Sequence, residues 1–442
     1  MKKIKKIMPI FLSIVLSVIC LSCCDKNNDE PVTLTMWHVY GEQATSPMDV
    51  LVDEFNSTVG KQEGIVVNVT ATSNSTEIGD VLLDSQFKKS GAKEMPDLFF
   101  CHAGNAVSLG IENLVNWRDY FSDDELSEYV PDFLDEGTID GKLVVFPVSK
   151  STHMLFINGS MFDRFSKDTG VTYEQLSTWD GFFDVAGKFY KWSKGKPFCA
   201  IDYFLRAVDL AYLSDSPSRK LYSDDGWYDP DNAVFKRKLD IFISSLVKGN
   251  ICVSDLYSNT QVMTGETAGG ISSSAAILYY NDTVTYPDNS SEPMNLVVLP
   301  LPANKGGVPC NTQAGTGLCA YKTTDEKAKA ANIFAKWLTE SERNLKFATD
   351  TGYMPVKKDA FDKVLDFEFK NEDYKKLYEA MSKMIIDYKF VEESSNKNYH
   401  PRAHNFYEEL RKHQENWRER YANGEDINIL VNECWDVFKN VK

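Results

Sequence analysis

The alternation of strand and helix signals over residues 32–109 constrains the fold of this chain more than any other feature. Alternating β-rich runs predict strands, and apolar residues at helical spacing predict helices. The expected order is strand 32–39, helix 48–58, strand 64–72, helix 76–90 and strand 96–100. The third strand is short and uniformly apolar, which is typical of a parallel sheet covered on both faces. The order predicts an α/β fold, and a further helix expected at 103–109 begins where open parallel sheets bind ligands.

Strand and helix signals continue to the C-terminus, and the chain is long enough for two domains. Thr178 is the expected N-cap of a helix over 181–192, and Asn423-Gly424 separates the last two expected helices. The other expected elements are helices 233–247, 275–280, 326–339 and 342–349, a β run at 265–274 and a strand at 295–300. We find no internal repeat.

The N-terminus has the pattern of an export signal. Lysines follow Met1, residues 7–21 are apolar, and Ser22-Cys23-Cys24 comes next. The apolar run is short for a membrane span, which favours cleavage over a retained anchor. A small residue before a cysteine resembles the bacterial lipoprotein signal. The resemblance implies a signal peptide over 1–23, lipidation at Cys23 with Cys24 as the alternative, and a solvated tether over 24–31.

The chain is strongly acidic. Its formal net charge is −16, and the leader carries four lysines and no acid, so the chain beyond it carries −20. Such a surface repels nucleic acid and suits a soluble exported protein. No second apolar run approaches a transmembrane length, so we expect membrane attachment through lipid only.

Cysteine and histidine spacings give no sign of a metal or cofactor. No pair of cysteines beyond the leader stands as C-x-x-C, which argues against zinc ribbons and thioredoxin chemistry. Two alternatives stay open for Cys310 and Cys319, a disulfide across a loop or buried free thiols. His400 and His404 are four residues apart, but Pro401 indicates that His400 lies at or before a helix start. We therefore expect no metal site and no cofactor.

A polar cluster, residues 149–153, stands between two apolar runs in the middle of the chain. Pro147 closes the first run, and Asn158-Gly159 stops the second. Enclosed hydroxyl and backbone groups need hydrogen-bond partners, so we expect this cluster to face either solvent or a ligand.

Several short blocks share their order with a known family. The blocks are Met36-Trp37-His38, Pro96-Asp97-Leu98, residues 151–158, Thr178-Trp179-Asp180, Ser272-Ser273-Ser274, residues 330–338 and residues 351–356. They resemble the extracellular solute-binding proteins of ABC importers, specifically the carbohydrate-binding group (family 1), near its glycerol-3-phosphate-binding branch. The most specific blocks are Ser-Thr-x-x-Leu-Phe-x-Asn and Gly-Tyr-x-Pro-Val.

The resemblance implies a two-lobed periplasmic-binding-protein-like fold. Each lobe would be a mainly parallel sheet flanked by helices, and a multi-strand hinge would join the lobes. The chain would cross to the second lobe near 147–152, return near 295–302 and cross again near 352–356. Lobe 1 would then comprise 32–148 plus 297–352, and lobe 2 would comprise 149–296 plus 353–442.

A sugar requires aromatic faces for its C–H surfaces and fixed polar groups for its hydroxyls. Gly315 matches a family position where the backbone approaches the ligand, and Tyr353 matches a ligand-contacting tyrosine in a fixed turn. The expected ligand-binding residues are Trp37, His38, Thr76, His102, Ser151, Thr152, Trp179, Trp227, Ser273, Ser274, Gly315, Thr316, Tyr353 and Arg402.

The family implies a lipid-anchored binder that delivers a sugar or oligosaccharide to the permease subunits of an ABC importer. It would be a monomer facing the periplasm or the cell exterior. Arg402 keeps a second ligand class open, a sugar-phosphate or glycerophosphodiester, because arginine pairs with phosphate. An exported glycoside-acting enzyme is the alternative of another class. The chain has no G-x-S-x-G, H-E-x-x-H or phosphate-cradling loop, so we expect no enzymatic activity.

Overall fold

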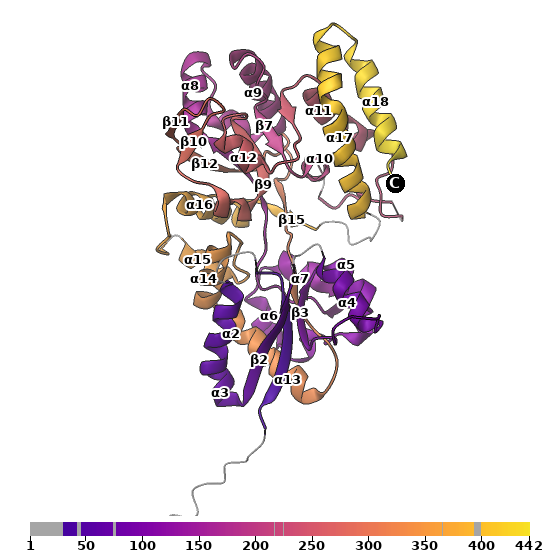
Figure 1. The fold of residues 1–442 in the computed structure, drawn as a ribbon, viewed down its shortest axis with the longest axis vertical. Coiled ribbons are helices and arrows are strands. Elements are labelled where there is room, and N and C mark those ends of the chain that lie inside the picture. The colour runs from indigo at the N-terminus through magenta and orange to yellow at the C-terminus, as the bar shows by residue number, and fades with distance from the viewer. Residues whose placement is uncertain are drawn as a thin grey trace, which may run out of the picture.

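The computed structural model describes residues 30–41, 46–73, 77–215, 217–223, 225–364, 366–392 and 399–442. They form two lobes, arranged one above the other along the long axis in Figure 1. Each lobe has its own sheet packed between helices. The predicted two-lobed α/β fold is therefore confirmed. The signal peptide, Cys23 and the tether up to residue 29 lie outside the described residues.

The lower lobe contains a four-stranded sheet with the order β14-β3-β1-β2. β1 (Val32–His38) is parallel to β2 (Ile65–Thr72) and to β3 (Leu98–Cys101). β14 (Gly317–Ala320) is antiparallel to β3. All four residues of β3 are buried, as its uniformly apolar sequence predicts.

Successive residues of β3 pack into different helical layers. Phe100 belongs to a cluster with residues of α2 (Pro47–Ser57) and α13 (Asp325–Leu338), whereas Phe99 belongs to a cluster with residues of α4 (Ile78–Gln86). This division follows from the two-residue period of a strand. The smaller elements of this lobe are α3 (Val59–Glu63), α5 (Ala103–Leu109), η1 (Ile111–Asn113), η2 (Trp117–Asp119), α6 (Asp123–Ser127), α7 (Pro131–Gly137), β4 (Thr138–Ile139) and β5 (Lys142–Leu143).

The upper lobe contains a five-stranded sheet with the order β12-β6-β9-β7-β8. β7 (Cys199–Ile201) is parallel to both β8 (Ile251–Cys252) and β9 (Gly269–Ser273). β6 (His153–Asn158) is antiparallel to β9 and to β12 (Leu296–Pro300). This sheet is therefore mixed, because the strand that enters from the hinge runs opposite to both of its neighbours.

Helices cover the upper sheet (Figure 1). The Thr178 hydroxyl accepts a hydrogen bond from the Gly181 amide at 3.2 Å, which confirms the predicted N-cap. The helices, 3-10 turns and small hairpin strands are α8 (Gly159–Thr169), η3 (Tyr173–Ser177), α9 (Trp179–Trp192), α10 (Phe204–Leu213), α11 (Ala233–Val247), α12 (Ser258–Met263), η4 (Ser274–Tyr279), β10 (Thr283–Thr285), β11 (Ser291–Pro293), α16 (Glu372–Asp387), α17 (Tyr399–Ala422) and α18 (Ile427–Asn440). As predicted, a break after Ala422 separates the last two helices. Within the described ranges, no helix is long and apolar enough to cross a membrane.

Backbone pairs tie the segments that cross between the lobes. Phe146 and Leu318 exchange two hydrogen bonds of 2.8 Å. Lys150 pairs with Met354, the two bonds being 3.1 and 2.7 Å, and Ser151 pairs with Ala314. The remaining elements near the hinge are β13 (Cys310–Thr312), parallel to β15 (Lys389–Val391), and the helices α14 (Ser341–Thr351) and α15 (Lys358–Val364). The predicted multi-strand hinge is thus built from main-chain hydrogen bonds.

The polar cluster at 149–153 lies in this hinge and is buried. The expectation that it faces solvent or a ligand is wrong for Ser149, Lys150 and His153, because side chains of other segments pair with them. The Lys150 ammonium pairs with the Glu136 carboxylate of α7, and the Ser149 hydroxyl lies 3.3 Å from the Tyr40 hydroxyl. His153 Nδ1 lies 3.1 Å from the Thr312 hydroxyl.

The return of the chain to the lower lobe lies further along than 295–302. β12 occupies that range and pairs along its whole length with β6, so it belongs to the upper sheet. The chain leaves this sheet only after Pro300 and joins the lower sheet at Gly317. β12 is apolar throughout, and a position between the lobes would leave these residues exposed.

The described cysteines are free thiols, and Cys310 and Cys319 are not paired. Cys319 Sγ lies 3.6 Å from Cys101 Sγ, across the β14–β3 pair. The Cys310 thiol instead donates to the Val308 carbonyl at 3.4 Å. Of the two alternatives, buried free thiols are confirmed.

Lys150→Met should lower the free energy of unfolding by about 3 kcal/mol, because it leaves the Glu136 carboxylate enclosed without its cation. The two side chains are only 2 and 13% exposed. The double variant Lys150→Met/Glu136→Gln should recover more than half of this loss in urea denaturation. Lys346→Met, which removes a lysine that is 68% exposed, serves as the control and should cost below about 0.5 kcal/mol. Additive losses in the double variant would contradict the coupling.

Candidate functional site

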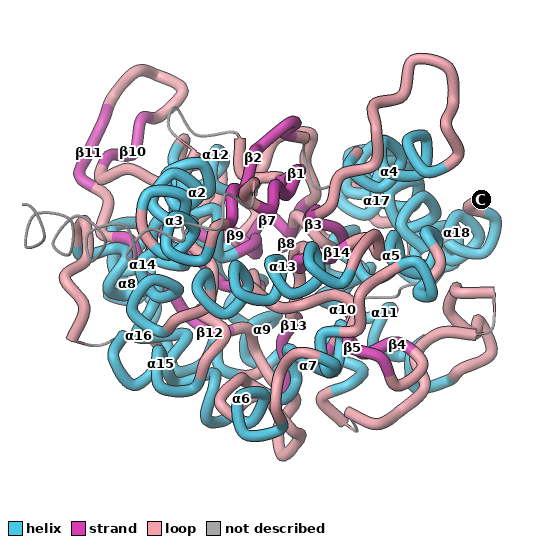
Figure 2. Tube along the Cα trace, turned by 90° about the horizontal axis from the view of Figure 1, so that it is seen from below, coloured by secondary structure: helices cyan, strands magenta, loops and turns pink. Residues whose placement is uncertain are grey.

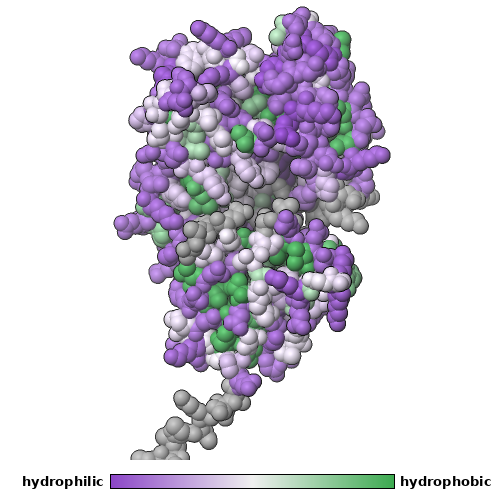
Figure 3. Space-filling view, in the orientation of Figure 1, coloured by the Kyte–Doolittle hydropathy of each residue, from purple (hydrophilic) through white to green (hydrophobic). Residues whose placement is uncertain are grey.

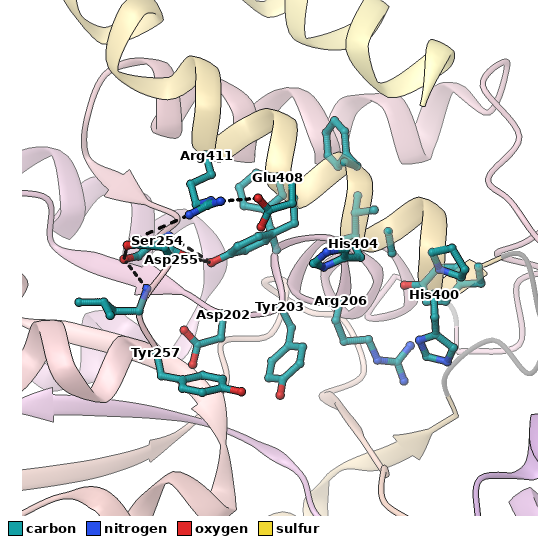
Figure 4. Close-up of a pocket in the computed structure, with 18 residues that line it drawn as sticks. Asp202, Tyr203, Arg206, Ser254, Asp255, Tyr257, His400, His404, Glu408 and Arg411 are labelled. Atoms are coloured by element: carbon teal, nitrogen blue, oxygen red, sulfur yellow. Dashed lines mark hydrogen bonds and ion pairs between the residues drawn. The ribbon is translucent and has the colours of Figure 1, made fainter. Parts of the chain in front are cut away.

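A pocket of about 940 Å³ opens in the upper lobe. Its walls come from residues that follow β7 and β8 and from the first half of α17. Parallel strands present their carboxyl ends at one edge of a sheet, which brings the two loops together. Figure 3 shows this face hollowed beside α17, and Figure 4 shows the lining side chains.

Asp202, directly after β7, is a carboxylate within this pocket. Its Oδ1 accepts a hydrogen bond from the Ser258 amide at 2.8 Å, and its Oδ2 accepts one from the Ser258 hydroxyl at 3.0 Å. Burial raises the pKa of Asp202 to about 6, although hydrogen bonds from Ser272 and Ser258 act in the opposite direction. Among the described residues, no lysine, arginine or histidine forms an ion pair with Asp202.

Two tyrosines are drawn next to Asp202 in Figure 4, Tyr257 below it and Tyr203 to its right. Tyr203 is 41% exposed and Tyr257 is 71% exposed, so both present ring surface to the pocket. The Tyr203 ring packs against the His153 ring at 4.7 Å between centroids, which connects the pocket to the hinge. Asp202, Tyr203 and Tyr257 were not among the ligand-binding residues expected from the sequence. The sequence feature that could have indicated this site is Asp202-Tyr203, a carboxylate and an aromatic residue directly after the apolar run 198–201.

The wall formed by α17 carries His400, His404, Glu408 and Arg411. The Arg411 guanidinium pairs with Glu408 and lies 3.8 Å from Asp255 on the opposite loop. α17 begins at Tyr399, before His400, so the expectation that Pro401 places His400 at or before the helix start is wrong. Both histidines line the pocket, one turn apart.

A buried polar network lies beneath the pocket. The Arg206 guanidinium of α10 donates to the Thr312 hydroxyl at 2.8 Å and to the Val391 carbonyl at 2.9 Å. It also lies 3.6 Å from Asp209, whose carboxylate accepts a bond from the Tyr222 hydroxyl at 3.0 Å. Because Thr312 and Val391 belong to β13 and β15, the pocket floor is tied to the hinge strands.

Tyrosines also lie where the hinge meets the lower lobe. Tyr353 is half-buried, with its ring 6.4 Å from the ring of Tyr40. Burial raises the pKa of the Tyr40 hydroxyl, the nearby Tyr353 hydroxyl adds to this rise, and hydrogen bonds from Ser149 and Thr316 oppose it. Gly315 has a φ of +109°, and an added Cβ would have no atom closer than 3.7 Å, so conformation rather than crowding requires glycine there.

Three of the expected ligand residues lie in the core, and the structure does not bring them to the pocket. The Trp37 indole is buried and donates to the Thr70 hydroxyl at 3.0 Å. His38 is buried, with Nε2 2.8 Å from the Asp49 carboxylate. Trp179 is buried among aromatic rings of the upper lobe. The rings of Trp37 and Trp179 pack in hydrophobic clusters and His38 pairs with Asp49, so none of the three side chains lines the pocket in this structure.

Trp227 and Arg402 form a contact with each other. The Arg402 guanidinium lies 4.4 Å from the centroid of the Trp227 ring, which is buried. Arg402 Nη1 also lies 3.4 Å from the Asp225 carboxylate. Neither residue lines the pocket described above. The geometry therefore assigns this arginine a cation–π and ion-pair role.

The remaining expected residues lie near the hinge or the strand ends. Thr152 and Ser274 are buried and share hydrogen bonds, the shorter from the Ser274 amide to the Thr152 carbonyl at 2.7 Å. Ser273, half-buried at the end of β9, caps the Ala275 amide. His102 is half-buried at the N-terminus of α5, on the lower lobe. Thr76 lies outside the described residues.

Comparison with known proteins gives one family. The family model described as bacterial extracellular solute-binding protein matches residues 51–377. No curated protein matches this chain in sequence.

Solved structures share the architecture. The cyclic α-maltosyl-1,6-maltose binding protein of Arthrobacter globiformis has a TM-score of 0.67 at 16% identity, covering 93% of this chain and 100% of that one. UgpB from Mycobacterium tuberculosis, in complex with glycerophosphocholine, has a TM-score of 0.64 at 14% identity, covering 92 and 97%. The sugar-binding protein MalE from Xanthomonas citri has a TM-score of 0.63 at 16% identity, covering 92 and 98%. At such identities the likeness establishes the fold alone.

Asp202 should make stability depend on pH in a defined direction. Its raised pKa means that the folded protein binds this proton more tightly than the unfolded chain, whose carboxyl titrates near 3.8. Its contribution to the free energy of unfolding is therefore present below pH 4 and lost as the pH rises through 6. Relative to Asp202→Asn, the native protein should lose about 2 kcal/mol between pH 4 and pH 7 in urea denaturation. Parallel pH profiles for the two proteins would disprove this.

Proposed function

We propose, on the premise that this chain belongs to the family of bacterial extracellular solute-binding proteins, that it captures a sugar or oligosaccharide between its lobes for an ABC importer. The observation that carries the proposal is the pocket at the strand ends of the upper lobe, where Tyr203 and Tyr257 expose ring surface beside Asp202. Exposed rings next to fixed polar groups suit the alternating apolar and hydroxyl faces of a sugar.

Lobe closure around the ligand is supported by the hinge. Its crossing segments are held by the backbone pairs of Phe146, Lys150 and Ser151. Such pairs hold the segments in register while a few dihedral angles change, which is how hinge closure proceeds. Tyr353, between these pairs and the lower lobe, is well placed to contact a ligand on closure.

We assign ligand contact to Tyr203, Tyr257, Asp202 and Tyr353, and also to Ser273 at the end of β9 in the upper lobe and to His102 at the start of α5 in the lower lobe. We assign a second set of residues to positioning the hinge, namely Ser151, Thr152, Ser274, Gly315 and Thr316. Four of them are buried, and Gly315 has a positive φ that favours glycine. For the lobes, we propose 32–148 with 317–352 as the first, and 149–300 with 366–442 as the second.

Binding without chemistry fits the pocket best. Of its carboxylates, Asp255 and Glu408 pair with Arg411, which leaves Asp202 alone as a candidate acid or base. Glycoside hydrolysis requires two carboxylates acting together. A phosphate ligand held by Arg402 is disfavoured, because that arginine stacks on Trp227 and faces Asp225.

Membership of this family also suggests the binding partners and the cellular location of the protein. We propose that the protein is exported, is attached through a lipid on Cys23, and docks as a monomer on permease subunits. The acidic charge of −16 for the whole chain suits an exported protein that avoids nucleic acid.

A carbohydrate should stabilise the protein and close it. In a panel of mono- and oligosaccharides, at least one compound at 100 times its Kd should raise the free energy of unfolding by about 2.7 kcal/mol. The same compound should reduce the radius of gyration in X-ray scattering and be recovered unchanged. Recovery of a cleaved product would instead identify an enzyme, and no stabilisation by any carbohydrate would refute the proposal.

Tyr203→Ala should weaken binding of that carbohydrate about tenfold, since a stacked ring contributes roughly 0.5–1.5 kcal/mol beyond its buried area and tenfold corresponds to about 1.4 kcal/mol. Calorimetry measures the affinity. Phe87→Ala provides the control, because Phe87 is an exposed aromatic of the lower lobe outside the pocket and should leave the affinity unchanged. Equal effects of the two substitutions would remove Tyr203 from the site.

A further inference from the structure

The charge balance around Asp202 carries an inference about the ligand. An ionised carboxylate offers about four acceptor positions. Ser258 occupies two of them through its amide and hydroxyl, at 2.8 and 3.0 Å, and the Ser272 side chain occupies a third. All three donors are neutral, so one acceptor position and the full negative charge remain.

The two arginines that line the pocket have partners other than Asp202. Arg206 is buried and bonded to Thr312 and Val391 of the hinge strands. Arg411 pairs with Glu408 and with Asp255. In Figure 4 His400 and His404 lie toward the start of α17, on the far side of Tyr203 from Asp202. Within the described part of the chain, no side-chain cation pairs with Asp202.

The rings beside Asp202 suit a cation as well. Tyr203 and Tyr257 come from separate loops and approach the carboxylate from two sides in Figure 4. Aromatic faces attract cations through their quadrupole, and the attraction grows where water is excluded. A carboxylate beside two such rings can combine a charge-assisted hydrogen bond with cation–π contact.

We propose that Asp202, Tyr203 and Tyr257 form a subsite for an ammonium group, so that the ligand is an amino sugar or an oligosaccharide containing one. This inference rests on the proposed carbohydrate-binding function. A neutral sugar diol would require two free acceptor positions on the carboxylate, and only one remains. An ammonium fills that one position with an N–H donor and supplies the missing charge.

The test uses β-1,4-linked disaccharides that differ only at C2, namely cellobiose with a hydroxyl, chitosan disaccharide with an ammonium, and chitobiose with a neutral acetamide. Calorimetry at pH 7 should give at least tenfold tighter binding for the ammonium compound than for either neutral one. Glycerophosphocholine against glycerol 3-phosphate tests a quaternary ammonium, which cannot donate a hydrogen bond. A preference confined to that second pair would overturn the amino-sugar assignment.

Substitutions then test which residue causes the preference for the ammonium compound. Asp202→Asn keeps the size of the side chain and one acceptor for Ser258, and it should remove the preference for the ammonium compound over both neutral disaccharides when all three are measured on this variant. Asp255→Asn is the matched control, because that pocket carboxylate already faces Arg411, and it should leave the preference intact.

The outcomes separate the two proposals. Equal affinity of the native protein for the three disaccharides, or a preference that survives in Asp202→Asn, overturns the ammonium subsite and leaves carbohydrate capture standing. No binding of any carbohydrate overturns both. The comparison of ligands on the native protein decides the matter even if Asp202→Asn does not fold.

Discussion

The main-chain pairing of the crossing segments is the constraint on which this structure depends. Lys150 and Ser151 each exchange two hydrogen bonds with a different segment, Met354 on one side and Ala314 on the other. A segment held on both sides cannot shift its register without losing both sets of bonds. The segments that join the lobes are therefore held in one fixed register.

This constraint also explains why polar residues are enclosed at the centre of the molecule. Side chains such as Lys150, His153 and Asn311 are buried where the segments meet, and each has a partner from another segment. Buried polar groups with satisfied partners specify one arrangement more strictly than apolar packing does. A hinge of this kind is an ordered joint rather than a flexible linker.

Much of the fold could be predicted from the sequence, because local patterns decide strands and helices. Thr178 caps its helix through a local hydrogen bond, which does not depend on where the helix packs. The apolar residues of β3 require a covering layer on each face of the sheet. The lobe to which a strand belongs depends on distant partners. The sequence of β12 is compatible with a strand of either lobe. Only its pairing with β6 assigns it to the upper sheet.

The site was harder to predict, because exposure of an aromatic ring is a tertiary property. Trp37 and Trp179 have the residue type that sugar sites use, yet both fill the core. Tyr203 and Tyr257 reach the pocket because they lie on the loops that follow β7 and β8, and nothing local distinguishes them from buried tyrosines such as Tyr228. The order of the family blocks indicated the crossings near 147–152 and 352–356, where Lys150 pairs with Met354, but it placed the return crossing too early in the chain.

The last two helices have a consequence for which part of the molecule holds the pocket wall. α17 supplies that wall, while both main sheets and the hinge pairs are made by residues up to 392. Phe406 and Trp417 of α17 and Phe438 of α18 are buried in the same hydrophobic cluster as Phe204 of α10. The wall is therefore anchored in the core of the upper lobe, and a change of the angle between the lobes would leave the wall in place beside Asp202.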